Sequence, residues 1–253
     1  MNFLNLIYLC CFVLAISAVS CSPDPTPAAH RYAISWYYPN QDYQRWIHTQ
    51  DSSAVFIELY GHAYNQLDSI LATCDGLILT GGLDIAPSRY GKVDSLSLCK
   101  SPNLRRDSIE FKAMQYAKKT GIPTLGVCRG MQIINVSFGG DLLLDIPSFN
   151  GSTLHQKEGT DARHLVYTAP EMEALIKADT ATTNSNHHQA VGRIGDGLQP
   201  LAWSTDSIVE AIRHMDTEAF PFLWGVQWHP ERMPRQSPMS KNLLSSFIHA
   251  TRP

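Results

Sequence analysis

A cysteine at the end of an apolar strand is the feature that most constrains this chain of 253 residues. The apolar run 124–127 ends at Cys128, a glycine follows at Gly130, and residues 131–138 have the pattern of a helix. Strand, thiol, tight turn and helix in this order are typical of a nucleophile elbow, which lifts the nucleophile above the sheet. The helix aims its free N–H groups at the sulfur and so favours thiolate. The alternative is a structural cysteine, because free cysteine is among the most buried residue types.

The rest of the chain predicts an α/β fold around this elbow. Strand patterns at 31–36, 54–59, 75–80 and 124–127 alternate with helix patterns at 41–50, 64–73 and 105–119. Short connections between such elements produce a parallel sheet covered by helices on both faces. Later patterns indicate strands at 164–168, 181–185, 198–204, 208–214 and 222–228, then a closing helix at 239–250. We therefore expect one α/β domain over residues 31–253, with ligand-binding loops at 82–103 and 148–163.

Charge and cysteine usage exclude some classes of function. The net charge of −3 gives no electrostatic case for nucleic acid. The chain has six cysteines but no CxxC pair, and no cysteine–histidine cluster has the spacing of a zinc site. We expect no metal and no cofactor. In an oxidising compartment Cys74 and Cys99 could form a disulfide or stay unpaired, and the sequence leaves both open.

The N-terminus has the pattern of a targeting segment. Residues 1–20 are largely apolar and end in small residues before Cys21, which resembles a bacterial lipoprotein signal cleaved before a lipidated cysteine. Residues 21–30 are rich in proline and indicate a tether. The match departs from the pattern in two ways: no lysine or arginine precedes Arg31, and Ala18 stands where a larger aliphatic residue is usual. An ordinary secretory signal or an uncleaved anchor is the alternative. The favoured prediction is export to a bacterial envelope, in the periplasm or outer membrane, with a lipid anchor in the membrane.

A base for the thiol is available near the C-terminus. His229 follows an apolar strand, and Glu231 stands two residues further on. In extended chain these two side chains point the same way, and Pro230 favours an extended path. A carboxylate beside an imidazole fixes its tautomer and raises its basicity. A solvated loop pair is the alternative for any isolated His-x-Glu.

Two further pairs have candidate roles. Gly81 and Gly82 follow a strand and could offer N–H groups to an oxyanion together with the Arg129 amide, although an ordinary turn explains them as well. The pair His187–His188 favours substrate contact over metal, because adjacent side chains point apart. His155 and His164 could join them, but the spacing fits no named site.

The order of these features resembles the class I glutamine amidotransferase-like proteins over residues 31–250. The closest likeness is to stand-alone γ-glutamyl hydrolases, particularly the γ-glutamyl-γ-aminobutyrate hydrolase type. The stretches that carry the resemblance are LTGGLDIAPSRYG (79–91), GVCRGMQIINV (126–136), GGDLLLDI (139–146), NSNHHQAV (184–191) and GVQWHPE (225–231). Leu83 departs from the family, where relatives often have proline, as does the leader.

The resemblance implies a flavodoxin-like, mostly parallel sheet in a three-layer fold. It also implies a catalytic triad of Cys128, His229 and Glu231, and an oxyanion hole around Gly82 and the Arg129 amide. The pocket for the γ-glutamyl group would be lined by Gln132, Asn186, His188 and Gln189.

The implied activity is hydrolysis of γ-glutamyl amide bonds in a small-molecule substrate through a γ-glutamyl thioester. Two alternatives are a glutaminase subunit of an amidotransferase and a surface lipoprotein that binds a glutamyl ligand without cleaving it. The leaving group stays open. Relatives are often dimers, which adds a homodimer to the expectations.

Overall fold

The computed structural model describes residues 29–93 and 98–251. The predicted signal peptide at 1–20, the lipidation site at Cys21 and nearly all of the predicted tether lie outside these residues. Within them, no helix combines the length and the apolar character needed to cross a membrane.

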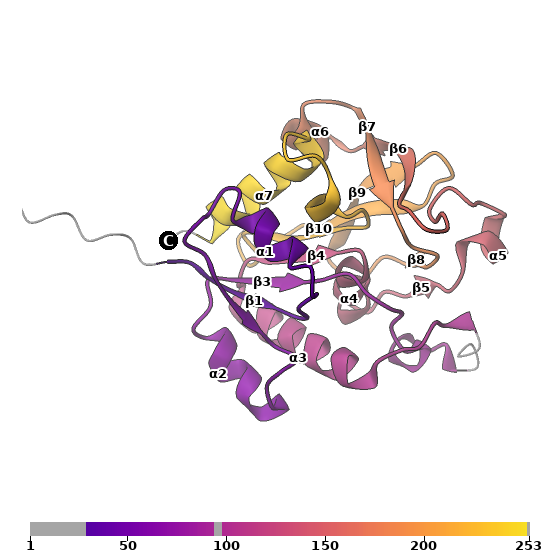
Figure 1. Ribbon diagram of the computed structural model, residues 1–253. Helices are drawn as coiled ribbons and strands as arrows, with labels where there is room; N and C mark the ends of the chain where they lie inside the picture. The colour runs from indigo at the N-terminus through magenta and orange to yellow at the C-terminus, as the bar shows by residue number, and fades with distance from the viewer. Residues whose placement is uncertain (1–28, 94–97, 252–253) are drawn as a thin grey trace, which may run out of the picture.

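A nine-stranded sheet runs through the middle of the molecule (Figure 1). Its strands are, in spatial order, β2 (Val55–Glu58), β1 (Arg31–Ile34), β3 (Gly76–Leu79), β4 (Thr124–Val127), β11 (Leu223–Val226), β10 (Val209–His214), β9 (Leu198–Ser204), β6 (Ala162–Thr168) and β7 (Thr180–Ser185). The five from β2 to β11 pair in parallel. The remaining pairings are antiparallel, so β10 and β6 run against the other strands. The mostly parallel sheet expected from the sequence is confirmed. A separate pair, β5 (Leu142–Leu143) with β8 (Ala190–Val191), was not anticipated.

Helices cover both faces of the sheet, as the sequence predicted (Figure 1). One face packs against α1 (Asp42–Ile47), α6 (Pro170–Ile176) and α7 (Pro238–Ala250), whose core residues include Trp46, Met172 and Phe247. The other face packs against α2 (Leu67–Leu71), α3 (Leu104–Thr120) and α4 (Arg129–Ser137), with Leu71, Met114 and Ile134 in that core. The sheet and the helices on its two faces form the three-layer fold. β4 ends at the carboxyl edge of the parallel strands, and Cys128 follows it there.

Several boundaries differ from the sequence prediction for local reasons. Residues 64–73 form a 3₁₀ turn at Tyr64–Gln66 before α2, rather than one helix. The predicted loop at 82–103 contains a 3₁₀ turn at Pro87–Tyr90, and α5 (Ile146–Asn150) occupies the start of the predicted loop at 148–163. The seven-residue α6 is too short for its periodicity to stand out.

Candidate functional site

The elbow at Cys128 has the strained backbone that such a turn requires. Cys128 adopts φ 51° and ψ −104°, a region that side-chain-bearing residues rarely enter. Its N–H donates to the Val226 carbonyl at 2.7 Å, which ties the elbow to β11. A side chain at Gly130 would collide with the Leu79 carbonyl, so glycine lets α4 begin directly on β3. As a result α4 starts at Arg129 rather than at the predicted Met131, and its N-terminus lies immediately beside the thiol.

The histidine–glutamate pair forms, but by a different backbone path from the one predicted. Nδ1 of His229 lies 2.8 Å from Oε1 of Glu231. The extended path expected through Pro230 is wrong, because Pro230–Arg232 is a 3₁₀ turn with proline at its first position. Proline is favoured there, since its missing N–H would have had no helical partner. The turn brings Glu231 back beneath the imidazole, where its side chain is only 3% exposed.

Gly81 shows how close the imidazole and the thiol are. A β-carbon added there would lie 2.9 Å from Cε1 of His229 and 3.7 Å from Cβ of Cys128. Burial alone would lower the pKa of His229, but the charges of Glu231 and Cys128 outweigh it and raise that pKa to about 10. With Nδ1 beside Glu231, the imidazole of His229 is a candidate base for a neighbouring thiol.

Asn184, at the end of β7, holds the backbone of His229. Its Oδ1 accepts from the His229 N–H at 3.1 Å, and its Nδ2 donates to the His229 carbonyl at 3.0 Å. The sequence stretch 184–191 was noted, but this residue was not assigned a role. Its partner stands 45 positions away, so local spacing gave no sign of the contact.

The two glycines at the end of β3 have different surroundings. The Gly81 N–H donates to the Tyr43 hydroxyl at 2.9 Å, so it does not face an oxyanion as expected. The Gly81 carbonyl accepts from Arg106 Nη2 at 2.5 Å and from the Tyr38 hydroxyl at 2.9 Å. Because C=O and N–H point in opposite directions across a trans peptide, the N–H of Gly82 is directed away from these donors. Gly82 has φ 147°, which favours glycine.

The Arg129 side chain is buried in a charge cluster with residues of α3. Its guanidinium pairs with Asp107 at 2.5 Å and also contacts Glu110. Arg106 Nε completes the cluster at 2.8 Å from Glu110. Burial and the neighbouring Arg106 lower the pKa of Arg129 to about 9. The cluster anchors the first turn of α4 to α3, and so fixes the direction of the Arg129 N–H beside Cys128.

All ten predicted pocket residues line one cavity of about 500 Å³. They are Gly81, Gly82, Cys128, Arg129, Gln132, Asn186, His188, Gln189, His229 and Glu231.

Three of these residues supply polar groups to the cavity wall. Gln132 Nε2 donates to the Gln189 carbonyl at 3.2 Å, and the buried Oε1 of Gln189 has no partner. His188 stands between Asp84 at 3.1 Å and Asp145 at 3.2 Å. Hydrogen bonding to Asp84 raises the pKa of His188 against the effect of burial. The wall therefore offers donors, acceptors and charge to a polar ligand.

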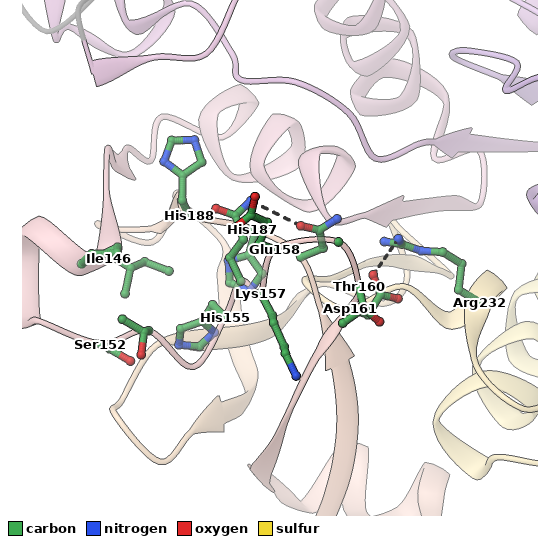
Figure 2. Close-up of a pocket in the computed structure, with 15 residues that line it drawn as sticks. Ile146, Ser152, His155, Lys157, Glu158, Thr160, Asp161, His187, His188 and Arg232 are labelled. Atoms are coloured by element: carbon green, nitrogen blue, oxygen red, sulfur yellow. Dashed lines mark hydrogen bonds and ion pairs between the residues drawn. The ribbon is translucent and has the colours of Figure 1, made fainter.

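A second cavity of about 650 Å³ adjoins the first (Figure 2). Both cavities are lined by Gln156, Asn186, His187, His188 and Arg232. Most of its remaining wall comes from the segment 152–161, which the sequence predicted to be a ligand-binding loop. The two cavities therefore share part of their walls.

The other two described cysteines are not paired. Cys74 and Cys99 are both free thiols. Cys74 donates to the Ile70 carbonyl, whereas Cys99 lies 3.4 Å from Nε2 of Gln189 at the edge of the first cavity. The disulfide that the sequence left open is absent from this structure.

A cysteine elbow on a mostly parallel sheet, with a histidine–glutamate pair beside it, defines a glutamine-amidotransferase-like hydrolase. The chain belongs to the Peptidase C26 family, whose model matches residues 15–231. It is 36% identical over 179 residues to Protein NtpR of Enterococcus hirae, covering 69% of this chain and 74% of that protein. It is 27% identical over 199 residues to the gamma-glutamyl-gamma-aminobutyrate hydrolase PuuD of Escherichia coli K12, covering 73% of this chain and 74% of PuuD.

Solved structures show the same fold. The glutaminase domain of Trypanosoma brucei CTPS with bound acivicin matches with a TM-score of 0.59 and 18% identity, over 88% of this chain and 94% of that chain. The family resemblance and the fold class predicted from the sequence are thereby confirmed.

Proposed function

We propose that this chain hydrolyses γ-glutamyl amide bonds with Cys128 as nucleophile and His229 as its base. The observation that carries the proposal is the placement of Cys128 and the Glu231-bound imidazole of His229 beside Gly81, in the wall of one cavity. A nucleophile, a base and a group that orients the base are what acyl transfer to sulfur requires.

The chemistry proceeds in two halves. Nε2 of His229 takes the proton of Cys128, and the thiolate attacks the side-chain carbonyl carbon of the γ-glutamyl group. The C–N bond breaks as the imidazolium returns the proton to the leaving amine, which leaves a γ-glutamyl thioester. Water, deprotonated by His229, attacks the thioester and releases glutamate and the thiol. Glu231 orients the imidazole through Nδ1 and stabilises the imidazolium.

The Gly82 and Arg129 amides are the candidate donors to the tetrahedral oxyanion. Arg106 and Tyr38 hold the carbonyl of Gly81, which favours an orientation in which the Gly82 N–H points away from both of them. The Arg129 amide stands at the N-terminus of α4, where backbone N–H groups lack helical partners. Each such donor contributes roughly 10²–10³ in kcat in acyl-transfer enzymes.

The γ-glutamyl group itself would bind in the part of the cavity lined by Gln132, Asn186, His188 and Gln189. The unpaired Oε1 of Gln189 is available to accept from its α-ammonium group. The second cavity favours a leaving group larger than ammonia, since glutamine would leave it empty. A γ-glutamyl amine is therefore the favoured substrate class over free glutamine, and the named activity of PuuD agrees with this choice.

A substrate panel tests the proposal. Purified protein is assayed for glutamate release from γ-glutamyl-γ-aminobutyrate, other γ-glutamyl amines and glutamine. Cys128→Ala should abolish release, whereas Cys74→Ala, which removes a thiol that lines neither cavity, should not. Full activity in Cys128→Ala would refute the mechanism, and a preference for glutamine would favour a glutaminase. Binding of these compounds without release by the wild-type protein would favour a ligand-binding role.

We also propose that the protein acts outside the cytoplasm, anchored through lipidated Cys21. The apolar leader, the small residues before Cys21 and the proline-rich segment that follows support this proposal. Mass spectrometry of the N-terminal peptide from the expressed protein tests it. An acylated Cys21 at the new N-terminus is the expected result, whereas a mature chain that begins elsewhere would overturn lipidation.

A further inference from the structure

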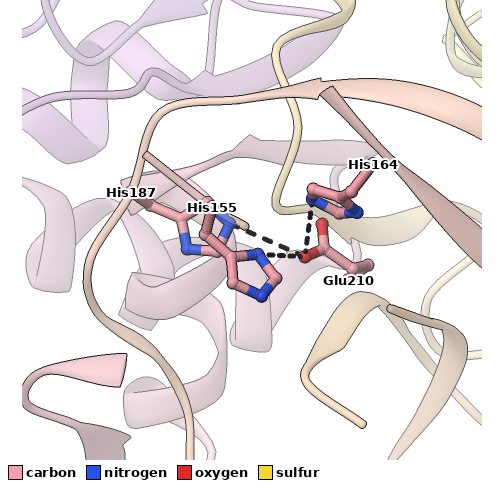
Figure 3. Close-up of side chains that lie close together, drawn as sticks. All are labelled: His155, His164, His187 and Glu210. Atoms are coloured by element: carbon pink, nitrogen blue, oxygen red, sulfur yellow. Dashed lines mark ion pairs between the residues drawn. The ribbon is translucent and has the colours of Figure 1, made fainter. Parts of the chain in front are cut away.

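Four buried side chains from separate segments converge beside the second cavity (Figure 3). His155 comes from the loop after α5, His164 from β6, His187 from the β7–β8 connection and Glu210 from β10. Their facing ligand atoms all lie within 4.8 Å of one another. From the sequence, the three histidines were considered together but Glu210 was not, and their spacing matched no named metal site, because each residue is supplied by a different element.

The atoms that face one another have no hydrogen-bond partners. Nδ1 of His155, Nε2 of His164 and Nε2 of His187 are all buried and unpaired, as are both carboxylate oxygens of Glu210. Leaving a buried polar atom unsatisfied costs roughly 1–3 kcal/mol. Four of these atoms, one from each residue, lie close together, and a single cation among them would satisfy all four.

The outer nitrogens of the three histidines are already engaged. Nε2 of His155 lies 3.0 Å from an Asp206 oxygen, Nδ1 of His187 lies 2.9 Å from the Gln189 carbonyl, and Nδ1 of His164 lies 3.3 Å from the Leu165 carbonyl. Because a carbonyl can only accept, an N–H must point outward at the last two. A lone pair then points inward, which is the arrangement that metal-binding histidines use.

The spacing of the inner atoms fits a small tetrahedral ion. Bonds of about 2.0–2.2 Å at the tetrahedral angle place neighbouring ligand atoms about 3.3–3.6 Å apart. The distances from Oε1 of Glu210 to the three histidine nitrogens are 3.2, 3.5 and 3.6 Å. The widest separation, up to 4.8 Å, would have to contract on binding.

We propose that His155, His164, His187 and Glu210 bind one divalent transition-metal ion, with zinc the best match to three imidazoles and one carboxylate. Four protein ligands fill a tetrahedral shell, so the ion has a structural role rather than a catalytic one. It fastens two segments that line the second cavity, the loop at 152–161 and the β7–β8 connection, to Glu210 on β10. This inference replaces the sequence-based expectation of no metal.

The proposal is tested by metal content, independently of any hydrolysis. Protein stripped with a chelator is mixed with ZnCl₂, passed over a desalting column and analysed for zinc. We expect about one zinc per chain, and a melting temperature that rises with zinc and falls again with EDTA. Glu210→Gln and His164→Gln should lose the retained zinc, whereas His249→Gln, at an exposed position of α7, should keep it.

A second measurement covers variants that fail to fold. Wild-type protein loaded with Co²⁺ should show the intense visible absorption of tetrahedral cobalt, and added Zn²⁺ should displace it. Absence of retained zinc, of a melting shift and of the cobalt bands in folded wild-type protein would overturn the proposal. The cluster would then be a protonated histidine–glutamate network. A failure of the wild-type protein to bind zinc would not bear on the role of Cys128, which glutamate release tests, so the two proposals fail separately.

Discussion

Gly81 lies against both Cys128 and its proposed base His229, and Gly81→Ala adds one methyl group at that position. The added carbon would lie 2.9 Å from Cε1 of His229, whereas ordinary contacts begin near 3.4 Å. The imidazole must therefore move by at least ~0.5 Å. It cannot yield freely, because Glu231 holds its Nδ1 and Asn184 holds its backbone. Misplacement by about 1 Å costs roughly 10²-fold in rate, so a loss of roughly 10-fold to 10²-fold in kcat is expected.

Two assays follow this change. Glutamate release from the best γ-glutamyl substrate gives kcat, and the rate of Cys128 alkylation by iodoacetamide at neutral pH gives the reactivity of the thiolate without any substrate. Both should fall in Gly81→Ala. The matched control is Gly61→Ala, whose new carbon would meet Glu58 at an ordinary 3.6 Å. If Gly81→Ala melts like the wild type and keeps both rates, His229 is not the base for Cys128.

Three further changes test the surroundings of the site. The high-pH limb of kcat/KM should lie near pH 10, because the imidazolium of His229 loses its proton at its raised pKa. In Glu231→Gln the carboxylate that stabilises this cation is gone, so a full pH profile should show the limb at lower pH. An unmoved limb would contradict that assignment. Asn184→Ala removes two hydrogen bonds to His229 and should lower kcat by roughly 10-fold with little change in KM, as steady-state kinetics would show. Arg129→Met should lower the free energy of unfolding in urea by roughly 3–5 kcal/mol, because it removes one of the cations that pair with buried Glu110. A urea midpoint equal to that of the wild type would refute the stabilising role of the cluster.

The sequence predicted those parts of the site that are encoded within short segments. The elbow at Cys128 needs one strand, one glycine and one helix in immediate succession, and periodicity reveals all three. The pairing of His229 with Glu231 also followed from a separation of two residues, although the backbone between them is a 3₁₀ turn and not a strand. Local spacing identified the partners, but it did not determine the conformation that joins them.

Contacts across the fold were beyond that reasoning. Arg106 orients the Gly81 carbonyl from 25 positions away, and Asn184 clamps a residue 45 positions away. Neither contact can be predicted from the local sequence pattern, because both depend on where α3 packs on the sheet and where β7 lies within it. Gly81 illustrates the same limit: its place beside the thiol was predicted, whereas the use of its N–H by Tyr43 was not.

The pair His187–His188 shows how one segment serves two sites. Adjacent side chains on extended chain point apart, which argued against a shared metal and remains correct for this pair. That same divergence lets His188 line the proposed γ-glutamyl pocket between Asp84 and Asp145, while His187 turns toward Glu210. A metal ion held by His187 would therefore fix the backbone on which His188 and Gln189 stand, and the hydrogen bond from His187 Nδ1 to the Gln189 carbonyl links the two sites directly. The proposed ion thus contributes to the shape of the pocket without approaching the thiol chemistry.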